Sequence, residues 1–289
     1  MNKLRVLLSL HIHPLLWLLL FLGVLTGSFV EITIIFILIF IHEMGHIGMA
    51  LFFRWRIRKI MFWPFGGVME TDEYFNRPYK EEFLVVLAGP LQHVWIHGVL
   101  LLLFQIDVLP EYLIQYALSY NIKLFLFNLL PIYPLDGGKI LLLLLSYKLP
   151  FKHVITYTIL LSTVFIVVCF SFTYAMEWNT FHTLSLACFL LLENRLEWKR
   201  RQFFFLRHLM ARYQHKGQPL SVIKKINATP STSVYAIMQK FQKGPYYHIN
   251  VPLDGGKSVI IDESQCLHAF FDLKKPYVKM GKLAEMVHT

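Results

Sequence analysis

The stretch from Ile32 to Phe53 is apolar apart from one polar motif, HEMGH, at residues 42–46. An apolar run of this length predicts a helix that crosses a membrane, because about 20 such residues span the hydrocarbon core. Ionisable side chains at that depth are costly and are rarely kept without a function. The chain is therefore expected to fold around a polar site that lies inside a membrane.

Two histidines of this motif have the spacing of metal ligands on a helix. His42 and His46 are four residues apart, so both rings project from one helix face. Glu43 lies beside them and is placed to take a proton from a metal-bound water. The alternative is a chance occurrence, but each of these side chains would cost about 2–3 kcal/mol at mid-bilayer unless paired or ligated. We therefore interpret the motif as a metal site.

The composition predicts an α-helical polytopic membrane protein with a small soluble part. Of the 289 residues, 56% are hydrophobic and only 16% are charged, against about 25% in soluble domains. The formal net charge of +10 does not indicate nucleic acid, because the basic residues lie beside apolar spans and in the tail, and no nucleic-acid motif is present. Cys169, Cys188 and Cys266 show no CxxC spacing, so neither a disulfide framework nor a thiolate zinc site is expected.

The hydrophobic pattern predicts about six transmembrane helices. The expected spans are residues 12–30, 32–53, 83–105, 112–147, 153–175 and 180–192. The fourth is too long for one plain helix and is broken by PIYPLDGG at residues 131–138. We expect a helix to about Leu130, an unwound stretch, and a short helix from Lys139.

The loops predict which side of the membrane each end occupies. One set of connections is basic and carries Arg54, Arg56, Arg58, Lys59, Arg77, Lys80, Lys148, Lys152, Arg195, Lys199, Arg200 and Arg201. The opposite set carries acidic residues and no Lys or Arg: Glu31, Asp107, Glu111 and Glu177. By the positive-inside rule, both termini are expected in the cytoplasm.

Two further segments have a recognisable character. Residues 61–68 are apolar but interrupted by Pro and Gly, which predicts a strand-like or re-entrant segment at the membrane edge. In the tail, residues 229–241 predict a turn entering a helix, and residues 246–251 and 258–262 predict two strands. The expected division is a membrane domain at 1–195, a linker at 196–220 and a small cytoplasmic α/β domain at 221–289.

Asp136 is the best candidate for a third metal ligand. A catalytic metal site uses three protein ligands and keeps one position open. Asp136 lies about as far from the cytoplasmic end of its segment as the histidine pair does from the end of its own, at about 1.5 Å per residue. The same letters, PLDGGK, recur at residues 252–257 in the polar tail, where they are turn chemistry, so Asp254 is not expected to bind metal. The alternative for Asp136 is an acid that faces a polar cavity beside a proline kink.

The third span contains a second histidine pair, His93 and His97. Because no acid lies between them, they are expected to be interior polar residues that are hydrogen-bonded to neighbours or waters. Near the break in the fourth span, Asn128 and backbone groups around Pro134 could hydrogen-bond an extended peptide.

The motifs HEMGH, Gly66-Gly67, AGP at residues 88–90 and NLLPIYPLDGG at residues 128–138 resemble the site-2 protease family of intramembrane zinc metalloproteases. The resemblance covers roughly residues 35–145 and implies zinc bound by His42, His46 and Asp136, with Glu43 as general base. Edge pairing of a substrate with the 61–68 segment would expose its scissile bond. Phe65, Gly66, Gly67, Asn128 and Pro134 are the expected substrate-binding residues.

Six spans and a tail that looks like a cystathionine-β-synthase (CBS) domain are similar to one branch of this family, which acts in endospore formation. The resemblance implies cleavage of the pro-form of sigma factor K, inhibition by sporulation membrane proteins, and a tail that responds to ATP. It also implies a place in the membrane around the forespore, facing the mother cell. A homo-oligomer is left open.

Two other classes of function share part of this pattern. A transporter or channel could use midplane His and Asp residues to bind or relay a cation, but it would not specifically need Glu43. A non-catalytic membrane sensor would have no use for a general base.

Overall fold

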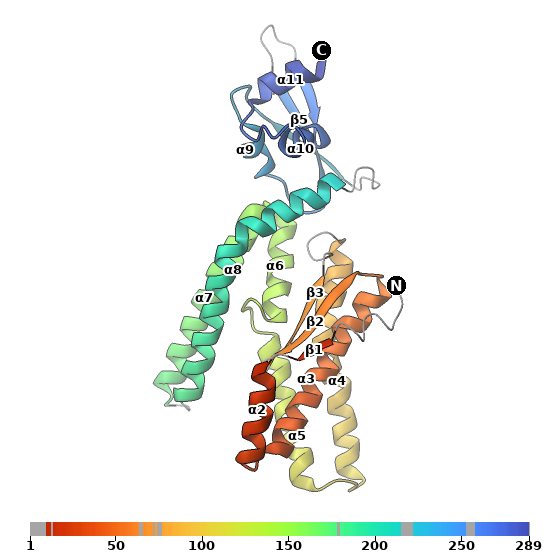
Figure 1. Ribbon diagram of the computed structural model, residues 1–289, viewed down its shortest axis with the longest axis vertical. Coiled ribbons are helices and arrows are strands. Elements are labelled where there is room, and N and C mark those ends of the chain that lie inside the picture. The colour runs from red at the N-terminus through yellow and green to blue at the C-terminus, as the bar shows by residue number, and fades with distance from the viewer. Residues whose placement is uncertain are drawn as a thin grey trace. The chain divides into compact units, whose positions relative to one another are not determined.

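A computed structural model describes residues 10–12, 14–63, 66–71, 73, 77–177, 180–214, 222–252 and 258–288 (Figure 1). The chain divides into two compact units, Met1–Ile140 and Leu141–Thr289. In the described residues, three helices are long and apolar enough to cross a membrane: Phe29–Phe52, Tyr79–Gln105 and Phe151–Ala175.

The first unit is a group of helices packed around α3 (Figure 1). Its helices are α2 (Pro14–Leu25), α3 (Phe29–Phe52), α4 (Tyr79–Gln105), α5 (Glu111–Asn128) and the start of α6 (Asp136–Lys148). Helices α4 and α5 begin directly after Pro78 and Pro110, because proline has no N–H with which to continue a preceding helical turn. Helices α3 and α4 approach closely, since a Cβ on Gly45 would lie 2.5 Å from the Ala88 carbonyl oxygen.

A three-stranded sheet belongs to the same unit. Its order is β1-β2-β3, with β1 (Leu10–Ile12) parallel and β3 (Gly66–Thr71) antiparallel to the central strand β2 (Ile57–Trp63). The expected strand-like segment is therefore confirmed, and β3 is an edge strand. A buried cluster joins the sheet to α3 and α4, and its members include Ile47, Trp55, Ile60, Met69 and Val85.

The start of the chain differs from the sequence-based expectation. A single helix was expected over residues 12–30, whereas the structure has the strand β1 followed by α2, a helix of 12 residues. Residues Leu10 to Ile12 pair with β2, a contact between segments about 50 residues apart that local hydrophobicity does not reveal.

The second unit consists of paired long helices and a small mixed domain. Helix α7 (Phe151–Ala175) packs against α8 (Thr180–Gln214). The tail contains β4 (Ile223–Asn227), α9 (Val234–Met238), β5 (Tyr246–Pro252), β6 (Ser258–Asp262), α10 (Glu263–Phe271) and α11 (Met280–His288). Its sheet has the order β4-β5-β6, with β4 parallel and β6 antiparallel to β5.

Strands β5 and β6 and the turn that enters α9 agree with the sequence-based expectation, whereas β4 was not predicted. The turn that contains Asp254 lies outside the described residues. Most of the segment expected to be a linker, residues 196–220, belongs to α8, which continues as a helix to Gln214.

Arg212 attaches the end of α8 to the tail domain. Its guanidinium forms two bonds with the Glu263 carboxylate, at 2.5 Å from Nε and 2.7 Å from Nη2. It also donates to the backbone oxygens of Gln242 (3.0 Å) and Pro245 (2.5 Å). The Glu263 side chain is only 2% exposed, so this pair is removed from water.

We predict that Arg212→Ala lowers the stability of the tail domain by about 3–5 kcal/mol, because it leaves the buried Glu263 charge without its partner. Hydrogen exchange of the full chain in detergent, read at tail amides, measures the change. The control is Arg200→Ala, because Arg200 is 62% exposed and its contact with Glu197 is worth less than about 1 kcal/mol. Equal protection in both variants would contradict the assignment.

Candidate metal centre

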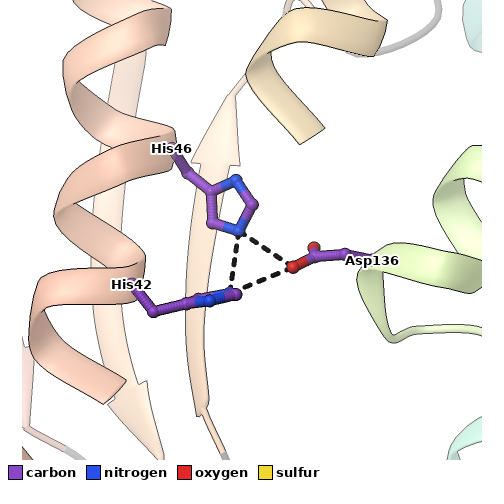
Figure 2. Close-up of side chains that lie close together, drawn as sticks. All are labelled: His42, His46 and Asp136. Atoms are coloured by element: carbon purple, nitrogen blue, oxygen red, sulfur yellow. Dashed lines mark hydrogen bonds and ion pairs between the residues drawn. The ribbon is translucent and has the colours of Figure 1, made fainter. Parts of the chain in front are cut away.

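Three buried side chains meet at one point between α3 and the first turn of α6. Figure 2 shows the rings of His42 and His46 on one face of α3, with the Asp136 carboxylate pointing toward both. Asp136 Oδ2 lies 3.0 Å from His42 Nε2 and 3.1 Å from His46 Nε2, and the two ring nitrogens are 3.1 Å apart. Among the described residues this is the one group of three or more His, Cys, Asp or Glu side chains arranged to hold a metal ion.

The local sequence explains how Asp136 reaches the histidines. Helix α5 ends at Asn128, the chain turns through residues 129–135, and α6 begins at Asp136 itself. The turn folds tightly against the new helix, because a Cβ on Gly137 would lie 2.2 Å from the Leu129 oxygen and one on Gly138 would lie 2.4 Å from Tyr133 N. Helix α6 thus begins three residues earlier than expected, which puts the ligand in its first turn.

The donor set fits zinc. Two imidazole nitrogens and one carboxylate oxygen are common zinc ligands, and three protein ligands leave a position for reaction. His46 Nδ1 lies 2.8 Å from the Val85 carbonyl oxygen, which can only accept, so Nδ1 carries the hydrogen. In the neutral ring, Nε2 then presents a lone pair toward the other ligands, as metal binding requires.

Each ligand also contacts a second residue. Lys139 Nζ donates to Asp136 Oδ1 at 3.0 Å, which leaves Oδ2 for the site. His42 Nδ1 lies 3.2 Å from His93 Nε2, and His93 Nδ1 lies 2.7 Å from Asn121 Oδ1. His93 is therefore an interior hydrogen-bonded residue, as expected, but its connection to a ligand was missed. The pairing of His93 with His97 was the available signal, whereas nothing local pointed to Asn121.

Glu43 lies next to the sheet. The residue is 7% exposed, and its Oε1 accepts a hydrogen bond of 2.8 Å from the backbone N–H of Gly67 in β3. A Cβ on Gly67 would lie 2.5 Å from Glu43 Cδ, so the strand approaches this closely only with glycine there. Gly66 begins the same strand, and Phe65 lies outside the described residues.

The other two expected substrate contacts flank the turn before α6. Asn128 is the last residue of α5, and its Nδ2 donates to the Leu124 oxygen at 3.1 Å. Pro134 lies in the turn, two residues before Asp136. Their role in binding substrate stays a prediction.

Comparisons with known proteins agree with this site. The family model for peptidase family M50 matches residues 30–108 and 105–170. Stage IV sporulation protein FB of Bacillus subtilis is 35% identical over 290 residues, which is 98% of this chain and 99% of that protein. A zinc metalloprotease of Methanocaldococcus jannaschii is 36% identical over 48% of this chain and 43% of its own length.

The solved structure of the site-2 protease from Methanocaldococcus jannaschii is also similar. It superimposes with a TM-score of 0.53 and 26% identity, over 65% of this chain and 89% of that one. Both histidines and Asp136 lie within the residues that the family model matches.

Gly89 of α4 provides a test of the site's geometry. A Cβ there would lie 2.2 Å from His46 Nε2 and 2.8 Å from His42 Nε2, so one ligand or the other must move. We predict that Gly89→Ala lowers the zinc content of the purified protein at least about tenfold, as loss of ligand geometry does. Metal analysis measures this, with Gly98→Ala on the same helix as control, because nothing lies within 4 Å of a Cβ there. Full zinc occupancy in Gly89→Ala would show that the site is misplaced.

Proposed function

We propose that this chain, which belongs to peptidase family M50 and is an intramembrane zinc metalloprotease, cleaves a membrane-associated precursor. The proposed place of cleavage is near the cytoplasmic face of the membrane. The observation that carries the proposal is the position of Glu43. It is the one carboxylate of the HEMGH helix turn, it is buried, and it is next in sequence to a metal ligand. A cation-binding site alone would not need it.

The proposed mechanism is metal-assisted hydrolysis of a peptide bond. His42, His46 and Asp136 would hold the zinc ion, which when bound would supply an activated water and polarise the scissile carbonyl. Glu43 accepts a proton from the attacking water and passes it to the leaving amine. The hydrogen bond from Gly67 N–H orients the Glu43 carboxylate, and its Oε2 remains for the proton. His42, His46 and Asp136 hold the metal throughout.

The substrate is proposed to extend along the edge strand β3. A helical peptide hides its carbonyl groups, so the scissile bond becomes accessible only when the chain is locally extended. The N–H of Gly67 points to Glu43 and away from β2. Every second residue of a strand directs its backbone groups to the same side. The backbone groups of Met69 therefore also point away from β2, to the edge of the sheet. A peptide paired there would lie beside Glu43. We propose that Phe65, Gly66, Gly67, Asn128 and Pro134 bind the substrate.

The pro-form of sigma factor K is the proposed substrate. The support is the similarity over 98% of the chain to a protein named for stage IV of sporulation, together with the resemblance stated in the sequence analysis. The same resemblance is the support for inhibitory sporulation membrane proteins as partners. It also supports a location in the membrane around the forespore, facing the mother cell.

The proposed topology has six spans and both termini in the cytoplasm. The first span would be residues 12–30, which include α2, and the others would be α3, α4, α5 with α6, α7, and residues 180–192 of α8. The basic loops described above support this orientation.

We further propose a protease domain at 1–195, a linker at 196–220 and a CBS-like regulatory domain at 221–289. The mixed sheet of the tail, with α10 and α11 packed against β5, supports a separate regulatory domain. A response of this domain to ATP rests on the resemblance alone, and homo-oligomer formation is left to measurement.

We predict that Glu43→Gln lowers cleavage of the sigma-factor-K precursor at least about 100-fold while zinc is retained, because it removes the proton acceptor and no ligand. Co-expression with the precursor at matched membrane levels measures cleavage, and metal analysis of both proteins measures zinc. Cleavage by both proteins would contradict the role of Glu43. Zinc flux into vesicles by wild type and variant alike would favour a transporter.

We predict that Gly67→Ala also lowers cleavage about 100-fold with zinc retained, because a Cβ 2.7 Å from Glu43 Oε2 displaces the carboxylate. The matched control is Gly48→Ala on α3, where a Cβ meets nothing within 4 Å. Wild-type cleavage by Gly67→Ala would show that β3 and Glu43 are not in contact in the working enzyme.

A further inference from the structure

His42 depends on side chains of two other helices, unlike His46. Its second nitrogen, Nδ1, lies 3.2 Å from Nε2 of His93 on α4, and Nδ1 of His93 lies 2.7 Å from Oδ1 of Asn121 on α5. His93 is 2% exposed and Asn121 is 1% exposed, so water does not compete for these contacts. The three residues form a line that leads from the metal centre through α4 to α5.

The donor and the acceptor of each hydrogen bond between His42, His93 and Asn121 can be assigned. Asn121 Nδ2 donates to the backbone oxygen of His93 at 2.8 Å, which fixes the orientation of the amide and turns Oδ1 toward the ring. An amide oxygen only accepts, so His93 Nδ1 must carry the hydrogen. Exchanging the amide atoms would place two oxygens against each other at the His93 carbonyl.

The donor and acceptor roles of His93 determine those of His42. With its hydrogen on Nδ1, neutral His93 has a lone pair on Nε2 and can only accept there. His42 Nδ1 must then be the donor, and His42 Nε2 is left with a lone pair that faces His46 and Asp136. The opposite tautomer of His42 would point a hydrogen at the metal position and prevent binding.

We propose that His93 and Asn121 are positioning residues for zinc, which act by fixing the tautomer and ring orientation of His42. For His46, the backbone oxygen of Val85 fixes the tautomer and the ring orientation, and no side-chain substitution removes this oxygen. His42 has no such backbone partner among the described contacts, so its state is set by His93 and Asn121. The inference rests on the metal centre and not on the proposed cleavage reaction, so metal affinity tests it separately.

A plain structural role is the competing explanation. Under it, His93 and Asn121 only satisfy each other between α4 and α5, and their loss would lower stability without a specific effect on metal. The two explanations differ in what a glutamine at position 93 would do. Its side-chain oxygen can accept from His42 and its amide can donate to Asn121, so His93→Gln keeps the direction of the line, whereas His93→Leu removes it.

The experiment measures zinc affinity of the full chain in detergent by competition with a chelator. We expect His93→Leu to bind zinc roughly 10- to 100-fold more weakly, as for other losses of a partner behind a metal ligand, and His93→Gln to stay near wild type. His97→Leu is the control, one turn along α4, where the buried His97 Nδ1 has no hydrogen-bond partner among the residues that the structure describes. It should leave affinity unchanged. Visible absorption of the cobalt(II)-loaded proteins should change for His93→Leu alone.

Asn121→Leu provides a second route should His93→Leu not purify as a folded protein. It lets His93 present either nitrogen as donor, so zinc affinity should fall by roughly tenfold. Where all variants fold, the double variant should be no weaker than His93→Leu, because Asn121 acts only through His93. Wild-type affinity in His93→Leu or in Asn121→Leu, or equal losses for His93→Gln and His93→Leu, would overturn the proposal.

Discussion

The meeting of the Asp136 carboxylate with two histidines of α3 is the constraint on which the first unit depends. The ligands are 94 and 90 residues apart in sequence, so the chain must bring α6 back against α3. In the membrane interior, these polar groups are stable only when they are ligated or paired. The break between α5 and α6, with glycines directly after Asp136, places the carboxylate beside the two histidines of the motif. Together these segments bring three ligand atoms to one point.

Each ligand is held by a different kind of partner. A backbone carbonyl of α4 holds His46, a lysine one turn along α6 holds Asp136, and a line of two side chains holds His42. Glycines 89 and 67 let α4 and β3 approach the ligands and Glu43 within distances that any side chain would prevent. The geometry of the metal centre therefore depends on close packing of the backbone of α4 and β3 as well as on the metal ligands themselves.

The sequence predicts the ligands well because their signal is chemical and local. HEMGH in an apolar run, and an Asp at matched depth, identify His42, His46 and Asp136, which the structure brings together. The sequence also predicts a strand-like segment within residues 61–68 and the tail strands β5 and β6, but neither the pairing of β2 with β3 nor the strand β4. What sequence could not provide are contacts between distant segments: β1 beside β2, and Asn121 behind His93. The length of α8, which continues to Gln214 beyond the apolar residues 180–192, is also not visible in the hydrophobic pattern, because charged residues such as Lys, Arg and Glu are good helix formers.

X-ray absorption at the zinc edge of the purified full chain tests the central claim most directly. The account predicts two imidazole nitrogens at about 2.0–2.1 Å with the remaining ligands oxygen, and no sulfur. The account predicts no sulfur because the ligand cluster of the described residues contains two histidines and one aspartate and no cysteine. A sulfur contribution at about 2.3 Å, or a single imidazole, would contradict the site built from His42, His46 and Asp136.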